Sequence, residues 1–127
     1  MTMKNLIIIL ALFTVQLGFG QDISRYFTEI SNGNINNMSQ KFSSTMEVCV
    51  NDTQEFMSKA EAITAINDFL KRVKPSSGKE LHTGSNKSGS KYGVGKITTS
   101  RGNYRVFINI ESKGSSYEIV SVVFSPE

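Results

Sequence analysis

Hydrophobic residues follow two different periods along this chain. In the first part they recur every three or four positions, the period of an amphipathic helix. In the second half they alternate with polar residues, the period of a half-buried strand. The predicted helices are residues 22–33, 34–42 and 58–74, and the predicted strands are residues 44–52, 79–83, 92–99, 103–111 and 116–124.

The helix over residues 58–74 has the clearest boundaries. Ser58 followed by Glu61 is the spacing of a capping box, and Pro75 ends the segment. Ile66 and Phe69 lie on its apolar stripe, so we expect both in the core.

The last three strands are separated by turns of hairpin length, at residues 100–102 and 113–115. Helices therefore come early and an antiparallel meander comes late. This order predicts an α+β fold, with N-terminal helices packed on a curved antiparallel sheet.

The stretch Gly93–Lys96, GVGK, invites comparison with a phosphate-binding loop. Such a loop needs an earlier glycine where Ser90 stands, a Ser or Thr where Ile97 stands, and a following helix. GVGK instead lies within a predicted strand. Gly93 and Gly95 share one face of that strand, which indicates a bend or the close approach of another element.

The first twenty residues resemble a secretory signal peptide. Lys4 precedes an uncharged apolar run at residues 6–15, and Gly18 and Gly20 stand before Gln21. A membrane anchor is the alternative, but a spanning helix needs about 20 apolar residues. We therefore predict a signal peptide at residues 1–20 and a single domain at residues 21–127, with no membrane span after cleavage. The predicted location is periplasmic or secreted, through Gram-negative-type bacterial export.

The charge and composition of the chain limit the classes of partner that we expect. The chain has 14 Lys and Arg against 11 Asp and Glu. Its basic residues are spread over loops and strands rather than clustered, so we expect no nucleic-acid partner. The single cysteine, Cys49, lies in an apolar strand and is expected to be buried, the alternative being a free thiol that pairs between chains.

The sequence contains few of the residue groupings that enzymes use for catalysis. His82 is the only histidine, and a lone histidine on a short strand is expected to face solvent. Glu47, Glu111 and Glu118 lie in strands and by alternation point away from the core. We therefore predict no catalytic residues, no metal ligands, no cofactor-binding residues and no cofactor.

Three segments carry a family resemblance, "INDFLKRVKP", "SGSKYGVGKITTSRGNYRVFINI" and "YEIVSVVF". They resemble a family of small exported bacterial proteins of unknown function within the nuclear transport factor 2-like fold. That resemblance implies a cone of sheet wrapped on a long helix. Enzymes of the wider fold place an acid–base pair inside the cone, and the inward faces predicted here offer none.

The sequence therefore favours a non-enzymatic binding or interaction module, whose ligand it does not identify. The alternatives are a small-molecule carrier and a cryptic enzyme, each using a pocket inside the cone. A tyrosine carries a polar tip that can line such a pocket, although aromatic residues of this kind also form cores. The candidate pocket-lining residues are Tyr26, Phe42, Phe69, Tyr92 and Tyr104.

The outer face of the predicted sheet carries apolar residues as well. Phe107 lies opposite the core-facing set of its strand, and Val120 and Val122 are predicted to share its surface. Because an exposed apolar patch usually marks an interface, we predict a homodimer through this face. The alternative is that a loop or the N-terminal segment covers the patch.

Overall fold

The structure is a computed structural model that describes residues 22–85 and 89–127. The predicted signal peptide, residues 1–20, lies outside the described residues. A first helix spans residues 22–31, followed by the 3-10 helix η1. The elements from η1 onward are η1 (Met38–Lys41), β1 (Phe42–Val50), β2 (Thr53–Ser58), α2 (Lys59–Val73), β3 (Pro75–Ser85), β4 (Lys91–Thr99), β5 (Gly102–Lys113) and β6 (Ser116–Pro126).

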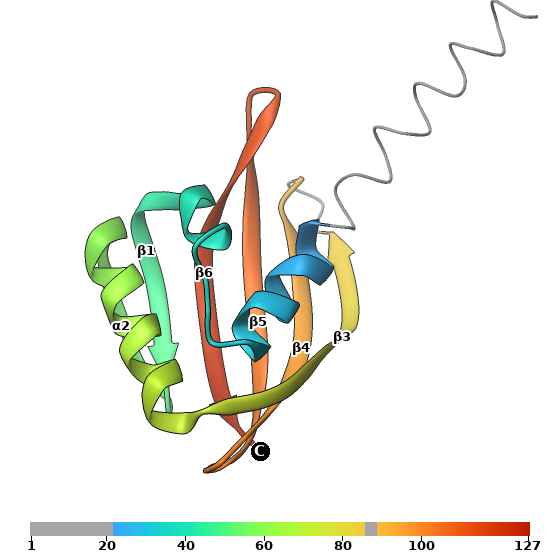
Figure 1. The fold of residues 1–127 in the computed structure, drawn as a ribbon. Coiled ribbons are helices and arrows are strands. Elements are labelled where there is room, and N and C mark those ends of the chain that lie inside the picture. The colour runs from blue at the N-terminus through green and yellow to red at the C-terminus, as the bar shows by residue number, and fades with distance from the viewer. Residues whose placement is uncertain (1–21, 86–88) are drawn as a thin grey trace, which may run out of the picture.

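The strands form one curved six-stranded sheet with the order β2-β1-β6-β5-β4-β3. Neighbouring strands are antiparallel except β1 and β6, which are parallel. The helix at residues 22–31, η1 and α2 all lie on the same side of the sheet (Figure 1). This arrangement confirms the predicted α+β class and leaves the other face of the sheet without a helix from the described part of the chain.

Helix α2 begins where the capping box predicts. The Ser58 hydroxyl accepts a hydrogen bond from the Glu61 backbone N–H at 3.2 Å, and a Glu61 carboxylate oxygen accepts one from the Ser58 N–H at 3.1 Å. Those bonds satisfy two N–H groups that have no hydrogen-bond partner within the helix. The bond from the Ser58 backbone lowers the pKa of Glu61. The helix ends at Val73, with Lys74 in a left-handed conformation before Pro75.

The predicted helix at residues 34–42 is wrong in extent, because only Met38–Lys41 is helical and as a 3-10 turn. Asparagines explain the difference. The side chain of Asn34 accepts a hydrogen bond from the Asn36 N–H at 3.0 Å, and such local bonds compete with helical ones. Phe42, at the end of the predicted helix, already begins β1.

Strand β2 is not predicted by the sequence pattern. Five of its six residues are exposed, so it shows no alternation of apolar and polar positions. It forms because Asn51 and Asp52 both adopt positive φ, 51° and 67°, and the chain folds back in a tight hairpin. β2 is an edge strand paired with β1, and Met57 stands opposite Met46.

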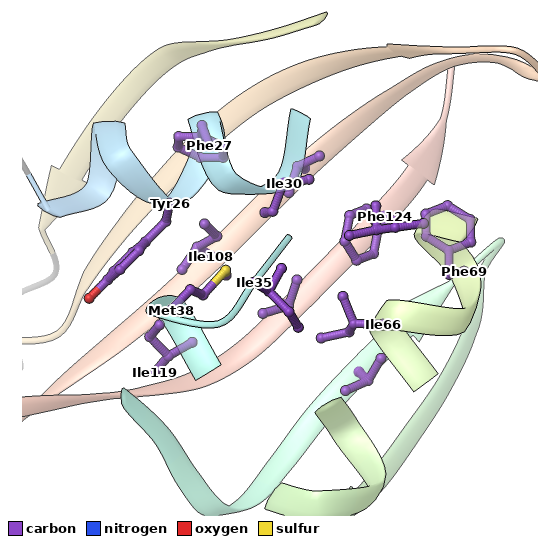
Figure 2. Packing of buried hydrophobic residues seen from close by; sticks show 14 of the residues in the cluster. Tyr26, Phe27, Ile30, Ile35, Met38, Ile66, Phe69, Ile108, Ile119 and Phe124 are labelled. Carbon is purple, nitrogen blue, oxygen red and sulfur yellow. The ribbon is translucent and has the colours of Figure 1, made fainter. Parts of the chain in front are cut away.

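Side chains fill the space between the helices and the sheet (Figure 2). Ile66 and Phe69 are buried there as predicted, with 0% and 1% exposure. The glycines of GVGK allow the first helix to lie directly on β4. A Cβ atom on Gly95 would stand 2.5 Å from a Phe27 ring carbon, and one on Gly93 would stand 2.7 Å from a methyl group of Ile23. The prediction of a close approach is therefore confirmed.

Candidate functional site

Most of the aromatic residues considered for a pocket inside the cone are core residues. Tyr26, Phe42, Phe69 and Tyr104 are only 4%, 3%, 1% and 7% exposed. The Phe69 ring meets Tyr104 edge-on, with 5.1 Å between ring centroids, and lies 4.8 Å from the Phe124 ring. These rings pack against one another instead of lining a hollow. Of these four, Phe42 also borders a pocket, at one end of the sheet.

Tyr92, the fifth candidate, is half-buried on the outer face of the sheet, away from the helices. Its hydroxyl lies 3.4 Å from Nε2 of His82, which is exposed as predicted. Within the described residues no group of three or more His, Cys, Asp or Glu side chains is arranged to hold a metal ion.

Two tyrosines and an aspartate form a polar cluster beside the first helix. The hydroxyl groups of Tyr26 and Tyr117 are 2.5 Å apart, and Tyr117 donates to a carboxylate oxygen of Asp22 at 3.0 Å. Burial raises the pKa of Tyr117, and its hydrogen bonds to Tyr26 and Asp22 raise it further. Burial raises the pKa of Tyr26 as well. Both phenols are therefore neutral near pH 7, and the cluster ties the first helix to β6.

The outer face of the sheet carries an apolar row that crosses four adjacent strands. Val94 of β4 stands opposite Phe107 of β5, Phe107 opposite Val123 of β6, and Val123 opposite Cys49 of β1. All four side chains are half-buried in the isolated chain, including Cys49, whose predicted burial is thus only partial. In Figure 1 the helices lie on the other side of the sheet, so no helix of the described part covers this row.

The predicted position of Val122 on this face is wrong, and Val123 takes its place. Asn109 pairs with Ser121 and Ile110 pairs with Ile119, which leaves Val120 as an extra residue in β6. Such a bulge shifts the alternation of the strand by one residue. Val122 therefore points into the core with 0% exposure, while Val120 is half-buried at the bulge.

Charged residues lie on both sides of the apolar row, toward the two ends of the strands. Toward the β4–β5 turn, Lys96 and Arg105 share the carboxylate of Glu127 at 3.3 Å and 2.7 Å, and hydrogen bonds from Arg105 lower the pKa of Glu127.

Toward the β5–β6 turn lie Glu111 and its partner Glu118, which forms an ion pair with Lys113 at 3.2 Å. Glu47 lies nearer the row on that side, where it accepts a hydrogen bond from Ser121 at 2.7 Å. The outer face is therefore basic at one end and acidic at the other.

Comparison with known proteins identifies the family. The model described as "Domain of unknown function (DUF4783)" matches residues 23–125. The chain belongs to the DUF4783 family. A search of curated proteins found no match.

Solved structures show the same fold. A DUF4783 family protein from Bacteroides ovatus has a TM-score of 0.74 at 20% identity, over 80% of this chain and 92% of that chain. Another, from Bacteroides fragilis, has a TM-score of 0.73 at 18% identity, over 80% of this chain and 94% of that chain. An Rd1NTF2_05 variant has a TM-score of 0.62 at 10% identity, over 86% of this chain and 98% of that chain. DUF4783 thus adopts a nuclear transport factor 2-like fold.

Among residues 22–85 and 89–127, no helix combines the length and the apolar character needed to cross a membrane.

Proposed function

We propose that this DUF4783 protein is an exported, non-enzymatic binding module that works through the outer face of its sheet, and that a second copy of the chain occupies this face. The apolar row Val94–Phe107–Val123–Cys49 carries the proposal, because a continuous apolar row on a face that no helix of the described residues covers is typical of an interface. A carrier or an enzyme of the cone type needs a hollow interior, whereas the space between the first helix and the sheet is packed with side chains (Figure 2).

Size supports a second copy as the occupant. Six strands about 4.8 Å apart and about nine residues long present a face of roughly 700 Å² in projection. An ordinary stable interface buries about 600–1,000 Å² on each partner. The face is therefore large enough for a dimer, whereas it is much larger than a small-molecule ligand needs.

Charge supports the same occupant and fixes its orientation. A two-fold axis that lies in the interface and runs perpendicular to the strands places the basic end of one copy against the acidic end of the other. Lys96 and Arg105 then face the carboxylates of Glu111 and Glu118 across the interface. An axis parallel to the strands would bring like charges together, so we propose the perpendicular one.

Sedimentation equilibrium at micromolar concentration tests this proposal. We expect the mass of two chains for the wild type and of one chain for Phe107→Glu and Val123→Glu, because each puts a charge into the apolar row. Thr64→Glu, at an exposed position of α2 on the helical side, is the matched control and stays dimeric. Far-UV circular dichroism shows whether each variant is folded. A monomeric wild type, or a Phe107→Glu dimer, would overturn the proposal and favour coverage of the row by the N-terminal segment.

A further inference from the structure

A pocket of about 310 Å³ lies at the end of the sheet where the β5–β6 hairpin projects. Three lysines from separate parts of the chain line it. Lys41 ends η1, Lys59 begins α2, and Lys113 ends β5. Figure 1 shows the hairpin extending past η1 and the first turn of α2, which brings these three segments to one end of the molecule.

The pocket carries an excess of positive charge. Lys113 is paired with Glu118 at 3.2 Å. Lys41 and Lys59 have no carboxylate partner among residues 22–85 and 89–127. The lining lysines and Glu118 together leave a net charge of about +2 in the pocket, by the ordinary charges of these groups at neutral pH.

Neutral groups hold the two uncompensated ammonium groups in place. Nζ of Lys41 donates to the Ser116 hydroxyl at 3.3 Å and lies 4.9 Å from the centre of the Tyr117 ring. Nζ of Lys59 donates to the backbone carbonyl of Gln40 at 3.4 Å. An ammonium group has three donors, so each lysine keeps donors for a ligand while its position is restrained.

We infer that this lysine pocket binds a phosphate monoester. Such a group carries a charge of about −1.5 to −2 at neutral pH and three acceptor oxygens, which matches the charge and the donors of the pocket. Lysine binds phosphate as a point charge. The volume is at the lower end of the range for small-molecule sites, which suits a phosphate with a small organic part.

Two kinds of ligand present a phosphate monoester. One is a free phosphorylated small molecule, and the other is a lipid headgroup such as that of phosphatidic acid. The pocket contains none of the four residues of the apolar row, although Glu118 borders both the pocket and the acidic end of the outer face. The inference is argued from Lys41 and Lys59, which lie outside the proposed interface.

Titration with inorganic phosphate, followed by ¹H–¹⁵N spectra of the protein, is the first test. We expect saturable shifts around Gln40 and Ser116. Lys41→Ala and Lys59→Ala should each weaken binding by about tenfold or more, the loss expected from removing a charge-assisted hydrogen bond. The control Lys71→Ala, at an exposed position in the last turn of α2, leaves the affinity unchanged. A parallel titration with chloride at the same ionic strength accounts for screening.

Vesicle sedimentation distinguishes the two sources. Binding to vesicles that contain phosphatidic acid, but not to phosphatidylcholine or phosphatidylglycerol vesicles, with loss in Lys41→Ala, supports the headgroup. Binding of soluble phosphate without vesicle binding supports the free ligand. The inference is overturned if neither probe binds, or if Lys71→Ala weakens binding as much as Lys41→Ala does. Melting temperatures of the variants show that any loss is not one of folding.

Discussion

The contact between the first helix and the sheet depends on Gly95 having no side chain. In a Gly95→Ala protein the new Cβ would stand 2.5 Å and 2.6 Å from two ring carbons of Phe27 and 2.9 Å from the carbonyl oxygen of Lys79. Carbon atoms in contact prefer about 3.5–4.0 Å, so the ring has to move by about 1 Å. Phe27 is only 1% exposed, and its surroundings leave it no free space for that movement.

Two opposing effects determine the size of the change. Forcing an additional methyl group into a packed core costs about 1–3 kcal/mol. Replacing glycine by alanine where the backbone permits it stabilises by about 0.4–1 kcal/mol, through the unfolded chain. We therefore expect Gly95→Ala to lower the free energy of unfolding by about 1–2 kcal/mol, the steric cost being the larger effect.

Urea unfolding measures this loss, provided that the m-value is unchanged. The same substitution in a Phe27→Leu background should cost less by more than about 0.5 kcal/mol, because contacting residues couple by at least that amount. Phe69→Leu is the matched control, since Phe69 is not among the atoms that the new Cβ would meet, and there the cost stays unchanged. A neutral or stabilising Gly95→Ala in the wild type would refute the packing of Phe27 on β4.

Three further predictions concern the core, the tyrosine cluster and the N-terminus. Phe69→Ala should lower the free energy of unfolding by about 3–5 kcal/mol, and a loss below about 1 kcal/mol would contradict its place in the core. Because burial and then hydrogen bonding raise the pKa of Tyr117 above its ordinary value of 10.0, the unfolded chain loses this proton at lower pH than the folded one. The contribution of Tyr117 to the free energy of unfolding should therefore be fully present below about pH 10 and be lost above it. Urea unfolding of Tyr117→Phe should show a weaker fall in stability above that pH, and an equal fall would argue against the cluster. Intact mass of the exported protein should show a chain that begins near Gln21, whereas a membrane-bound form retaining residues 1–20 would contradict cleavage.

Local signals explain which elements could be predicted from the sequence. The start of α2 could be predicted because both partners of its capping box lie within four residues of each other, at Ser58 and Glu61. β2 could not, because an exposed edge strand has no buried face and so no alternation. Its only sequence signal is the turn at Asn51 and Asp52, which shows where the chain reverses but not that the next six residues pair with β1.

The candidate sites depend on register and on long-range contacts, which the sequence does not encode locally. Phe107 could be placed on the outer face because its own strand alternates regularly. Val122 could not be placed correctly, because the bulge at Val120 arises from the pairing of β6 with β5. The lysine pocket could not be predicted for a related reason. Its cations are far apart in sequence, and only the fold brings Lys41, Lys59 and Lys113 together.

The packing of the first helix also determines where this protein can bind anything. A hollow cone requires that the helices stand away from the concave face of the sheet. Here Gly93 and Gly95 remove the side chains that would keep Ile23 and Phe27 at a distance, and the two residues occupy the space directly. A ligand could enter the space under the first helix only if that helix moved, which would expose buried apolar surface and break the hydrogen bonds of Tyr117. Recognition is therefore left to surfaces that this helix does not cover, among them the outer face of the sheet and the lysine pocket beside the β5–β6 hairpin.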